Sequence, residues 1–306
     1  MKVLIAGGSG FIGKHLIASL IADSHQVWVL SRNPQKKIKG AQIVGWNGET
    51  TDGWGQLIDE MDAVVNLSGL SLHSWPWTGR KKQRFHDSRV IPGRALATAI
   101  KDASHRPEVF VQISGINYYG LQGEDVANET TPPADDYLAQ LTVAWEAATK
   151  SVEDVGVRHV VCRTAVVLAG DAILLWLMAF PVLLFVGGPF GSGNQAMPWI
   201  HVDDQIGAIR YLMENPEAKG PYNLIAPQLT SNAEFMRTLA KVLRRPYWFR
   251  FPTFMMRLVL GEMSVLVTEG RFSKPERLFE IGYNMHFSNL EDALRDIFKK
   301  QQVSKG

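Results

Sequence analysis

The chain has 306 residues, and its 32 Lys and Arg nearly balance 30 Asp and Glu, leaving a net charge of +2. That length can form one large domain or two lobes around a sizeable core. The charge balance gives no reason to expect nucleic acid or an anionic membrane surface as a partner. The single cysteine, Cys162, excludes an intramolecular disulfide and fits a reducing compartment, and its apolar neighbours indicate core packing rather than a reactive thiol.

The start of the chain carries the most informative pattern. An apolar run at residues 2–6 breaks into glycines, and apolar residues then recur at helical spacing over 11–22. This order predicts a buried parallel strand, a tight turn and the start of a helix. Glycine permits the turn and lets backbone amides approach a pyrophosphate, while the helix N-terminus attracts its negative charge. We therefore expect a dinucleotide-binding turn, formed by Gly7, Gly8, Ser9, Gly10, Phe11, Ile12 and Gly13.

Strand and helix patterns alternate along the first half of the chain. Further strands are predicted at 26–31, 41–45, 62–67 and 109–114. Helical patterns stand at 54–60, 80–102 and 137–155, and a β-rich run follows at 157–168. Alternation of this kind indicates a parallel sheet with helices on both faces. The expected fold class is α/β, a Rossmann-type doubly wound parallel sheet with a smaller mixed α/β lobe at the C-terminus.

The same patterns predict how the chain is divided. We expect a dinucleotide-binding domain at 1–168 and a substrate-side C-terminal lobe at 169–306, with residues 199–225 returning to the first domain. Segment 172–186 is almost wholly apolar, but it is shorter than the ~18 residues that a membrane span requires. We interpret it as a buried helix or the lining of an apolar pocket. The first predicted strand begins at residue 2 with no signal-peptide pattern before it, so we expect a cytoplasmic protein without a membrane span.

The end of the second strand indicates which dinucleotide is bound. Ser31 and Arg32 stand at the end of this strand. An acidic residue there would bond the ribose 2′-hydroxyl of NAD, whereas a basic residue suits a 2′-phosphate. Ser31 can add a hydroxyl donor. The sequence therefore predicts NADP(H) as the cofactor.

Several motifs carry a resemblance to a known family. The glycine turn, Asn66-Leu-Ser-Gly69 after the fourth strand and Ser114 after the fifth resemble the extended short-chain dehydrogenase/reductases. Motifs that narrow the resemblance are Trp77-Thr78, Ser88-Arg89-Val90, Tyr118-Tyr119-Gly120, Trp145-Glu146, Trp199-Ile-His-Val-Asp-Asp204, Phe249-Arg250-Phe251-Pro252 and Ile281-Gly282-Tyr283. Together they resemble a subgroup usually labelled epimerases, sometimes SulA-like cell-division inhibitors, which has a C-terminal domain of its own. The resemblance implies that Leu67, Ser68 and Gly69 contact the dinucleotide.

The resemblance also implies a catalytic serine, a tyrosine and a lysine four residues after the tyrosine. In that family the tyrosine exchanges a proton with the substrate oxygen, and the lysine lowers its pKa and holds the nicotinamide ribose. Ser114 occupies the serine position and Tyr137 the tyrosine position, but Leu141 stands where the lysine should. Lys150 is too far along the chain to replace it. Because a phenol without a nearby cation keeps a pKa near ~10, Tyr137 is either a packing residue or a weak catalyst.

A second tyrosine, Tyr119, stands just beyond the fifth strand, at the sheet edge where ligands bind in such folds. It either donates a proton to substrate or closes the turn as an aromatic plug. Arg163, in the next strand, either clamps an anion, orients Tyr119 or forms an ion pair at the sheet edge.

One histidine is also a candidate. His201 lies just before a predicted helix, and we interpret it as structural, with Asp203 or Asp204 as the N-cap of that helix. No His, Cys and Asp spacing matches a ligand set, so no metal is expected.

Two functions follow from these observations. The first is an NADP(H)-dependent oxidoreductase or epimerase that acts on an unknown small molecule, in which Ser114 polarises the substrate oxygen and Tyr119 or Tyr137 supplies the proton. The apolar segment 172–186 favours a substrate more apolar than a nucleotide-sugar. The second is a non-catalytic NADP(H)-binding protein that regulates or assembles with a protein partner, because the lysine is missing.

Overall fold

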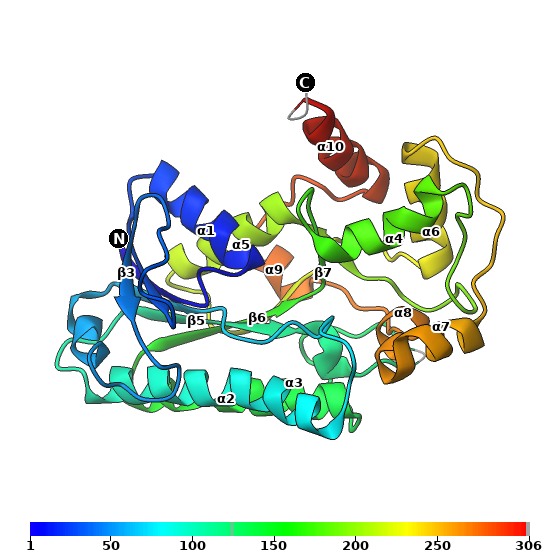
Figure 1. The fold of residues 1–306 in the computed structure, drawn as a ribbon. Coiled ribbons are helices and arrows are strands. Elements are labelled where there is room, and N and C mark those ends of the chain that lie inside the picture. The colour runs from blue at the N-terminus through cyan, green and yellow to red at the C-terminus, as the bar shows by residue number, and fades with distance from the viewer. Residues whose placement is uncertain (124, 304–306) are drawn as a thin grey trace.

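A parallel sheet lies at the centre of the molecule. The computed structural model describes residues 1–123 and 125–303. Seven strands pair in the order β3-β2-β1-β4-β5-β6-β9, all parallel (Figure 1). They are β1 (Lys2–Ala6), β2 (Gln26–Ser31), β3 (Ala41–Gly45), β4 (Ala63–Asn66), β5 (Val109–Gly115), β6 (Arg158–Thr164) and β9 (Gly220–Leu224). The strand order reverses between β1 and β4, and such a reversal opens a ligand-binding crevice at the carboxyl ends of the strands.

Helices cover both faces of this sheet, which confirms the predicted fold class. Figure 1 shows α2 (Gly79–Asp102) and α3 (Tyr137–Ala147) beneath it and α1 (Phe11–Ala22) and α5 (Val202–Glu214) above it. β1 and β4 are almost wholly buried between the two layers. Buried parallel strands read as continuous apolar runs rather than alternating ones, which is why the sequence predicted them well.

The remaining elements form the C-terminal part. β7 (Val166–Leu168) pairs in parallel with β8 (Trp199–His201). Helices complete it: α4 (Ile173–Leu183), α6 (Asn232–Val242), α7 (Thr253–Leu260), α8 (Val265–Thr268), α9 (Glu276–Glu280) and α10 (Leu290–Val303). One hydrophobic cluster runs from β1 through α4 to α10. The division at residue 168 therefore stays a prediction, since the apolar core continues across it.

Three predicted elements differ from the structure. Segment 54–60 forms a 3₁₀-helix, Gly55–Glu60. The predicted helix 137–155 ends at Ala147 and resumes as a 3₁₀-helix, Lys150–Val155, because the hydroxyl of Thr149 bonds the carbonyl of Glu146 and the buried ring of His159. The run 157–168 divides at Ala165, whose N–H donates to β9 while Val166 pairs toward β8.

Two other 3₁₀-helices are Ile116–Tyr119, after β5, and Gly261–Ser264, after α7. Cys162 is free and fully buried in β6, as its apolar neighbours predicted. Burial raises the pKa of its thiol. None of the helices in the described part of the chain is long and apolar enough to cross a membrane.

Candidate dinucleotide site and its neighbours

The glycine turn between β1 and α1 leaves no room for side chains. Gly7 has a φ of +75°, and a Cβ there would lie 2.7 Å from the carbonyl carbon of Leu67. A Cβ on Gly13 would lie 2.5 Å from the carbonyl oxygen of Gly8. Both glycines are therefore required for the close approach of α1 to the strand and of the turn to the loop after β4.

The first turn of α1 is open to an anion. Gly10 is its N-cap and offers no side-chain acceptor, and no acidic residue stands in this turn. The backbone N–H groups of Phe11 and Ile12 therefore have no capping side chain. Helix N-termini carry a partial positive charge and bind phosphate through such groups. The cradle fits the pyrophosphate of a dinucleotide.

The end of β2 offers a cation, Arg32, that is free of partners within the described part of the chain. The side chain of Arg32 is exposed and makes no hydrogen bond or ion pair with the described residues. The hydroxyl of Ser31, in contrast, donates to the carbonyl of Asn33 and accepts from its N–H at 3.0 and 3.2 Å. Of these two predicted contacts, Arg32 is the one whose side chain is not already used within the protein.

The loop after β4 forms the opposite wall of the turn. The N–H of Leu67 donates to the carbonyl of Ala6, which ties this loop to β1. The N–H of Ser68 donates to Asn66 Oδ1 at 3.0 Å, but the Ser68 hydroxyl is buried and has no hydrogen-bond partner among the residues that the structure describes. A buried polar atom without a hydrogen-bond partner is costly, so a hydroxyl or phosphate of a ligand would supply the missing hydrogen bond.

A buried ionic network lies at the end of β5. Ser114 Oγ donates to Glu146 Oε1 at 2.6 Å, and Arg163 binds both oxygens of the same carboxylate at 2.9 Å. Burial opposes the charged guanidinium, but the hydrogen bonds and the charge of Glu146 outweigh it and raise the pKa of Arg163. Two of the alternatives left open for Arg163 therefore hold together: it forms an ion pair, and it also contacts Tyr119.

Tyr119 completes this network and has no exposed surface. Its hydroxyl donates to Asn223 Oδ1 at 2.7 Å and accepts from Arg163 Nη1 at 2.9 Å. Burial raises the pKa of Tyr119 to about 12 against the opposing effect of Arg163. Its hydroxyl therefore links β9 to β6.

Tyr137 makes no hydrogen bond to this network among the described residues and lies at the contact of α3 with α2. Its hydroxyl donates to the backbone carbonyl of Lys82 at 3.3 Å, and its ring packs edge-on against Trp77. Burial raises the pKa of Tyr137, and the charge of Arg89 opposes that shift. Leu141 is buried and brings no charge to Tyr137, and Lys150 is exposed. The ammonium of Lys82 lies over the Tyr137 ring, 4.9 Å from its centre, and pairs with Glu262 at 2.6 Å.

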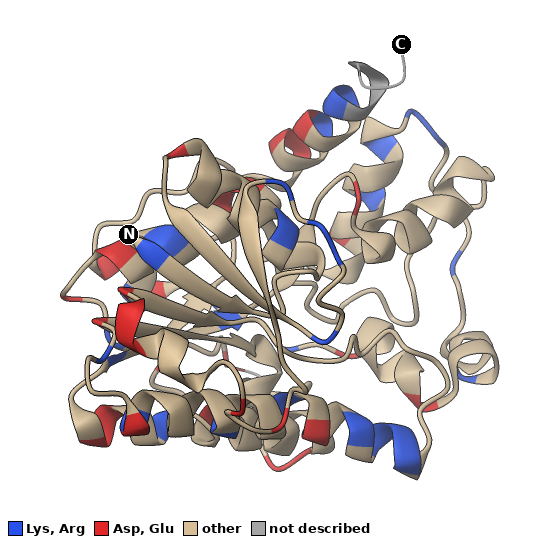
Figure 2. Ribbon diagram, turned by 60° about the vertical axis from the view of Figure 1, so that its left-hand side comes forward, with Lys and Arg blue, Asp and Glu red and all other residues tan. Residues whose placement is uncertain are grey.

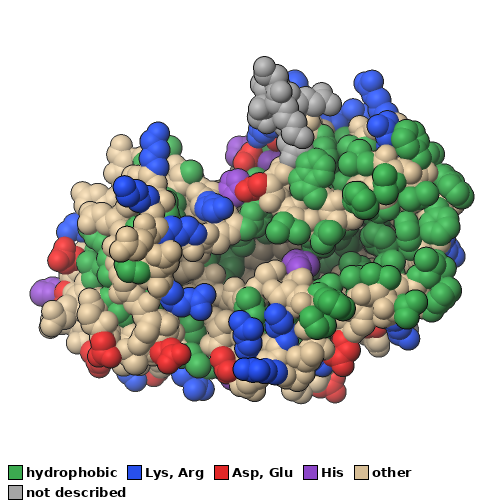
Figure 3. Space-filling model, in the orientation of Figure 1, with side chains coloured by type: hydrophobic (Ala, Val, Ile, Leu, Met, Phe, Trp, Pro, Cys, Tyr) green, Lys and Arg blue, Asp and Glu red, His purple; other side chains and the backbone are tan. Residues whose placement is uncertain are grey.

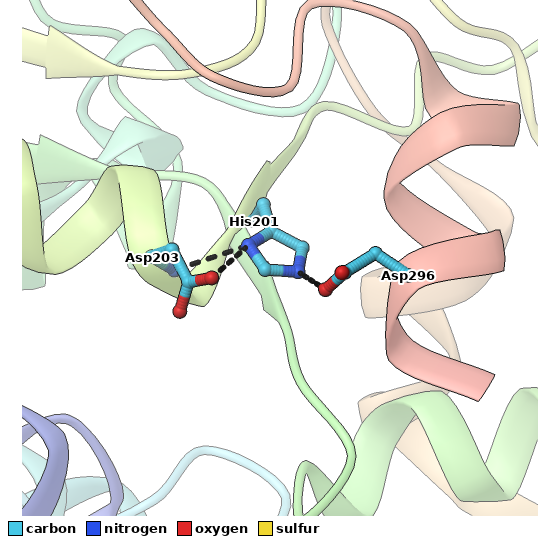
Figure 4. A group of neighbouring side chains, drawn as sticks. All are labelled: His201, Asp203 and Asp296. Atoms are coloured by element: carbon cyan, nitrogen blue, oxygen red, sulfur yellow. Dashed lines mark hydrogen bonds and ion pairs between the residues drawn. The ribbon is translucent and has the colours of Figure 1, made fainter. Parts of the chain in front are cut away.

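His201 joins two helices (Figure 4). Its Nδ1 accepts from the N–H of Asp203 at 3.1 Å, and its Nε2 lies 3.3 Å from Asp296 Oδ2 on α10. The N-cap of α5 is thus His201 rather than Asp203 or Asp204. The prediction failed because Asp204 is buried and instead accepts from the N–H groups of His286 and Phe287.

This cluster has the residue types of a metal site, but a lysine ammonium lies beside its carboxylates. His201, Asp203 and Asp296 offer ligand atoms within 4.8 Å of one another. Lys300 Nζ lies 3.1 Å from Asp203 and 2.8 Å from Asp296, so one ammonium already pairs with both carboxylates. We interpret the cluster as a clasp between α5 and α10.

Apolar side chains are exposed on two helices of the C-terminal part. Figure 3 shows hydrophobic side chains gathered over α4 and α7, on both sides of a hollow. On α4, Ile173, Leu177 and Phe180 are each more than half exposed, although the opposite side of this helix is in the core. On α7, Leu258 is 85 % exposed and no residue is buried. We call these exposed residues of α4 and α7 the apolar face.

The glycine turn at the crevice of a doubly wound sheet defines a Rossmann-type, dinucleotide-binding class of protein. Comparison with known proteins narrows the class. The sequence model of the NAD dependent epimerase/dehydratase family matches residues 3–225, and that of a domain of unknown function, DUF1731, matches 251–297. The chain therefore belongs to the NAD dependent epimerase/dehydratase family.

Relatives match this chain over nearly all of its length. Epimerase family protein YfhF of Bacillus subtilis is 33 % identical over 99 % of this chain and 100 % of its own. The chloroplastic SDR39U1 homolog of Arabidopsis thaliana is 35 % identical, covering 98 % and 87 %. The crystal structure of human epimerase family protein SDR39U1 with NADPH has a TM-score of 0.88 at 32 % identity, covering 98 % and 99 %. This chain is thus an NAD(P)-binding member of the family.

Sequence reasoning missed three residues of this region. Glu146 binds Ser114 and Arg163, Asn223 accepts from Tyr119, and Arg89 lies beside the loop after β4. Glu146 and Arg89 stood in motifs that carried the family resemblance, but nothing in their spacing indicated what they contact. Asn223 comes from a strand more than a hundred positions beyond Tyr119.

Proposed function

We propose that this protein binds NADP(H) rather than NAD(H) and catalyses an oxidoreduction or epimerisation of a small molecule with an apolar part. The observation that supports this proposal most strongly is the pairing of the open glycine cradle with Arg32, a cation at the end of β2 that has no partner among the described residues. A 2′-phosphate placed there would gain a charge-assisted hydrogen bond. The human relative with bound NADPH supports the same choice.

In this proposal NADP(H) supplies or accepts the hydride when it is bound. Tyr137 holds the proton that is exchanged with the substrate oxygen, and Ser114 orients that oxygen. Ser114 must give up its hydrogen bond to Glu146 Oε1 to donate to substrate. Tyr119, which is fully buried and bonded on both sides, acts through Arg163 as a positioning residue.

The apolar face supports a proposal for the class of substrate. Exposed apolar helices mark surfaces that bind ligands or partners. α4 begins two residues after Asp171, which hydrogen-bonds His15 on α1 at 3.0 Å, so the apolar face starts beside the glycine cradle. We propose carbonyl or carbinol compounds with an aliphatic or aromatic tail, in preference to nucleotide-sugars.

Titrations with NADPH and with NADH test the choice of cofactor, and a panel of apolar aldehydes and ketones tests the reaction. NADPH should bind the purified protein more tightly than NADH, and Arg32→Asp should weaken NADPH by roughly tenfold to a hundredfold, the worth of one charged hydrogen bond. Tighter NADH binding together with an unaffected Arg32→Asp variant would overturn the choice. NADPH oxidation should occur with some apolar aldehydes or ketones and be lost in Ser114→Ala and Tyr137→Phe.

A second function is favoured by the absence of a lysine four residues after Tyr137 and by the engagement of Ser114 with Glu146. In it the protein binds NADP(H) without turnover and regulates or assembles with a protein partner. Partner capture that differs between NADP⁺ and NADPH, with no oxidation across the panel, would favour this function over catalysis.

A further inference from the structure

Arg89 is a buried cation that none of the described carboxylates neutralises. It lies on α2 with only 6 % of its surface exposed, and no carboxylate of the described residues is within ion-pair distance. Its contacts are one hydrogen bond from Nη1 to the carbonyl of Phe85 at 3.0 Å and the ring of Trp145, 4.7 Å from Cζ. Arginines are rarely buried unless they are paired, since burying an uncompensated charge is costly. Burial lowers the pKa of Arg89 to about 10, so it is still charged at neutral pH.

The position of this charge is informative. A Cβ placed on Gly69 would lie 3.4 Å from Arg89 Cζ, so the guanidinium lies directly against the loop after β4. The same loop holds the Ser68 hydroxyl, which has no partner within residues 1–123 and 125–303. Two polar groups that lack sufficient partners therefore stand side by side at the carboxyl edge of the sheet.

The sheet order decides which part of a dinucleotide reaches this point. β2 with Arg32 lies on one side of the glycine turn, and β4 with β5 lies on the other. A dinucleotide whose pyrophosphate is on α1 and whose 2′-phosphate is at Arg32 must extend its nicotinamide half toward β4 and β5. This half is where the family resemblance expects a lysine that the chain lacks.

We propose that Arg89 takes the place of that lysine: its guanidinium holds the nicotinamide-side ribose hydroxyls of NADP(H) and places a positive charge beside Tyr137. The inference rests on the proposed function. A guanidinium suits this role because it offers several planar donors, of which the carbonyl of Phe85 uses one. The charge of Arg89 reaches Tyr137 from α2, across the contact of two helices, rather than from one turn further along α3. Lys82, also on α2, lies over the Tyr137 ring with Nζ 4.9 Å from its centre, but Glu262 pairs with that ammonium at 2.6 Å. The ring of Tyr137 packs on Trp77, Trp77 packs on Phe85, and the carbonyl of Phe85 holds Arg89, so both side chains belong to one contact between α2 and α3. The charge of Arg89 opposes the rise that burial causes in the pKa of Tyr137.

The test compares two ligands on one variant. Arg89→Met keeps an unbranched side chain against Trp145 but removes the charge. It should weaken NADPH by about tenfold to a hundredfold, as the loss of a charge-assisted hydrogen bond implies. It should leave 2′,5′-ADP, which lacks the nicotinamide riboside, within about twofold of wild type. Arg94→Met, an exposed arginine on the same helix, is the matched control and should change neither affinity.

A spectroscopic readout separates this role from a structural one. Phenolate absorbance during a pH titration, taken as the difference from Tyr137→Phe, should show a higher pKa for Tyr137 in Arg89→Met than in wild type. Equal weakening of both ligands, or no weakening of either, would show that Arg89 only joins α2 to α3. If Arg89→Met does not fold, Arg89→Lys carries the test: it should weaken NADPH by a smaller factor and spare 2′,5′-ADP. Failure of the wild-type protein to bind NADPH would refute the proposed function instead.

Discussion

Replacing Tyr119 by Phe removes one oxygen atom from the buried network and nothing else. The ring stays in place, but Asn223 Oδ1 loses its donor and Arg163 Nη1 loses its acceptor. Tyr119 has no exposed surface, so water cannot replace either bond. A neutral hydrogen bond contributes about 1 kcal/mol net and one to a charged group about 1.5–3 kcal/mol. We therefore expect the free energy of unfolding to fall by about 2–4 kcal/mol.

Urea unfolding followed by tryptophan fluorescence measures this loss. Tyr118→Phe is the matched control, because the Tyr118 ring stacks on Arg163 at 3.4 Å while its hydroxyl makes no hydrogen bond to the described residues. The control should change stability by less than about 0.5 kcal/mol. A loss below that value in Tyr119→Phe would refute the positioning role. Loss of turnover at unchanged stability would mean that Tyr119 is the proton donor.

Further measurements address the cradle, the clasp and the apolar face. Gly13→Ala should cost roughly 1–3 kcal/mol of stability and weaken NADPH, because its Cβ would meet the Gly8 carbonyl, whereas Gly79→Ala has open space and should do neither. Burial lowers the pKa of His201, and the charges of Asp203 and Asp296 oppose this shift. The neutral ring therefore stabilises the folded state fully above the unfolded pKa of 6.5, and this contribution is lost as the pH falls through the lower pKa of the folded state. His201→Asn keeps a helix cap without titrating, so its unfolding free energy should fall less between about pH 7 and 5, and an unchanged pH dependence would contradict the clasp. Leu258→Ser, at the most exposed position of the apolar face, should raise KM for apolar substrates without changing NADPH affinity.

The sheet was predictable because its signal is local. β1 and β4 are buried on both faces and are nearly continuous apolar runs, whereas in β6 only Val160, Val161 and Cys162 form such a run. A glycine turn has few alternatives once a strand precedes it. The break in the predicted helix 137–155 was not predictable, since it depends on a bond from Thr149 to His159, a residue of the next strand. The N-cap of α5 was missed for a similar reason: Asp204 is held by backbone groups at 286 and 287.

The candidate site was predictable where it depends on position in a motif and not where it depends on side chains meeting across the fold. Arg32 and the glycines follow from their distance along the chain. Glu146, Arg163 and Asn223 come from three different elements, and only the packing of α3, β6 and β9 brings them together. A sequence can show that a lysine is missing at 141, but it cannot show which distant residue carries the charge instead.

When the positive charge comes from α2 instead of α3, the pKa of Tyr137 depends on different contacts. A lysine four residues after a tyrosine is held beside it by the helix itself, whatever that helix packs against. Arg89 acts on Tyr137 only while α2 and α3 stay in contact, and the ring of Trp145, stacked on Arg89, maintains that contact. The pKa of Tyr137 is therefore coupled to helix packing. Trp145→Leu should raise the pKa of Tyr137 and weaken NADPH binding, although Trp145 makes no hydrogen bond to Tyr137 or to the glycine turn in the described part of the chain. If the variant loses stability but keeps the wild-type tyrosine titration and NADPH affinity, the charge on Arg89 does not depend on that packing, and the coupling is refuted.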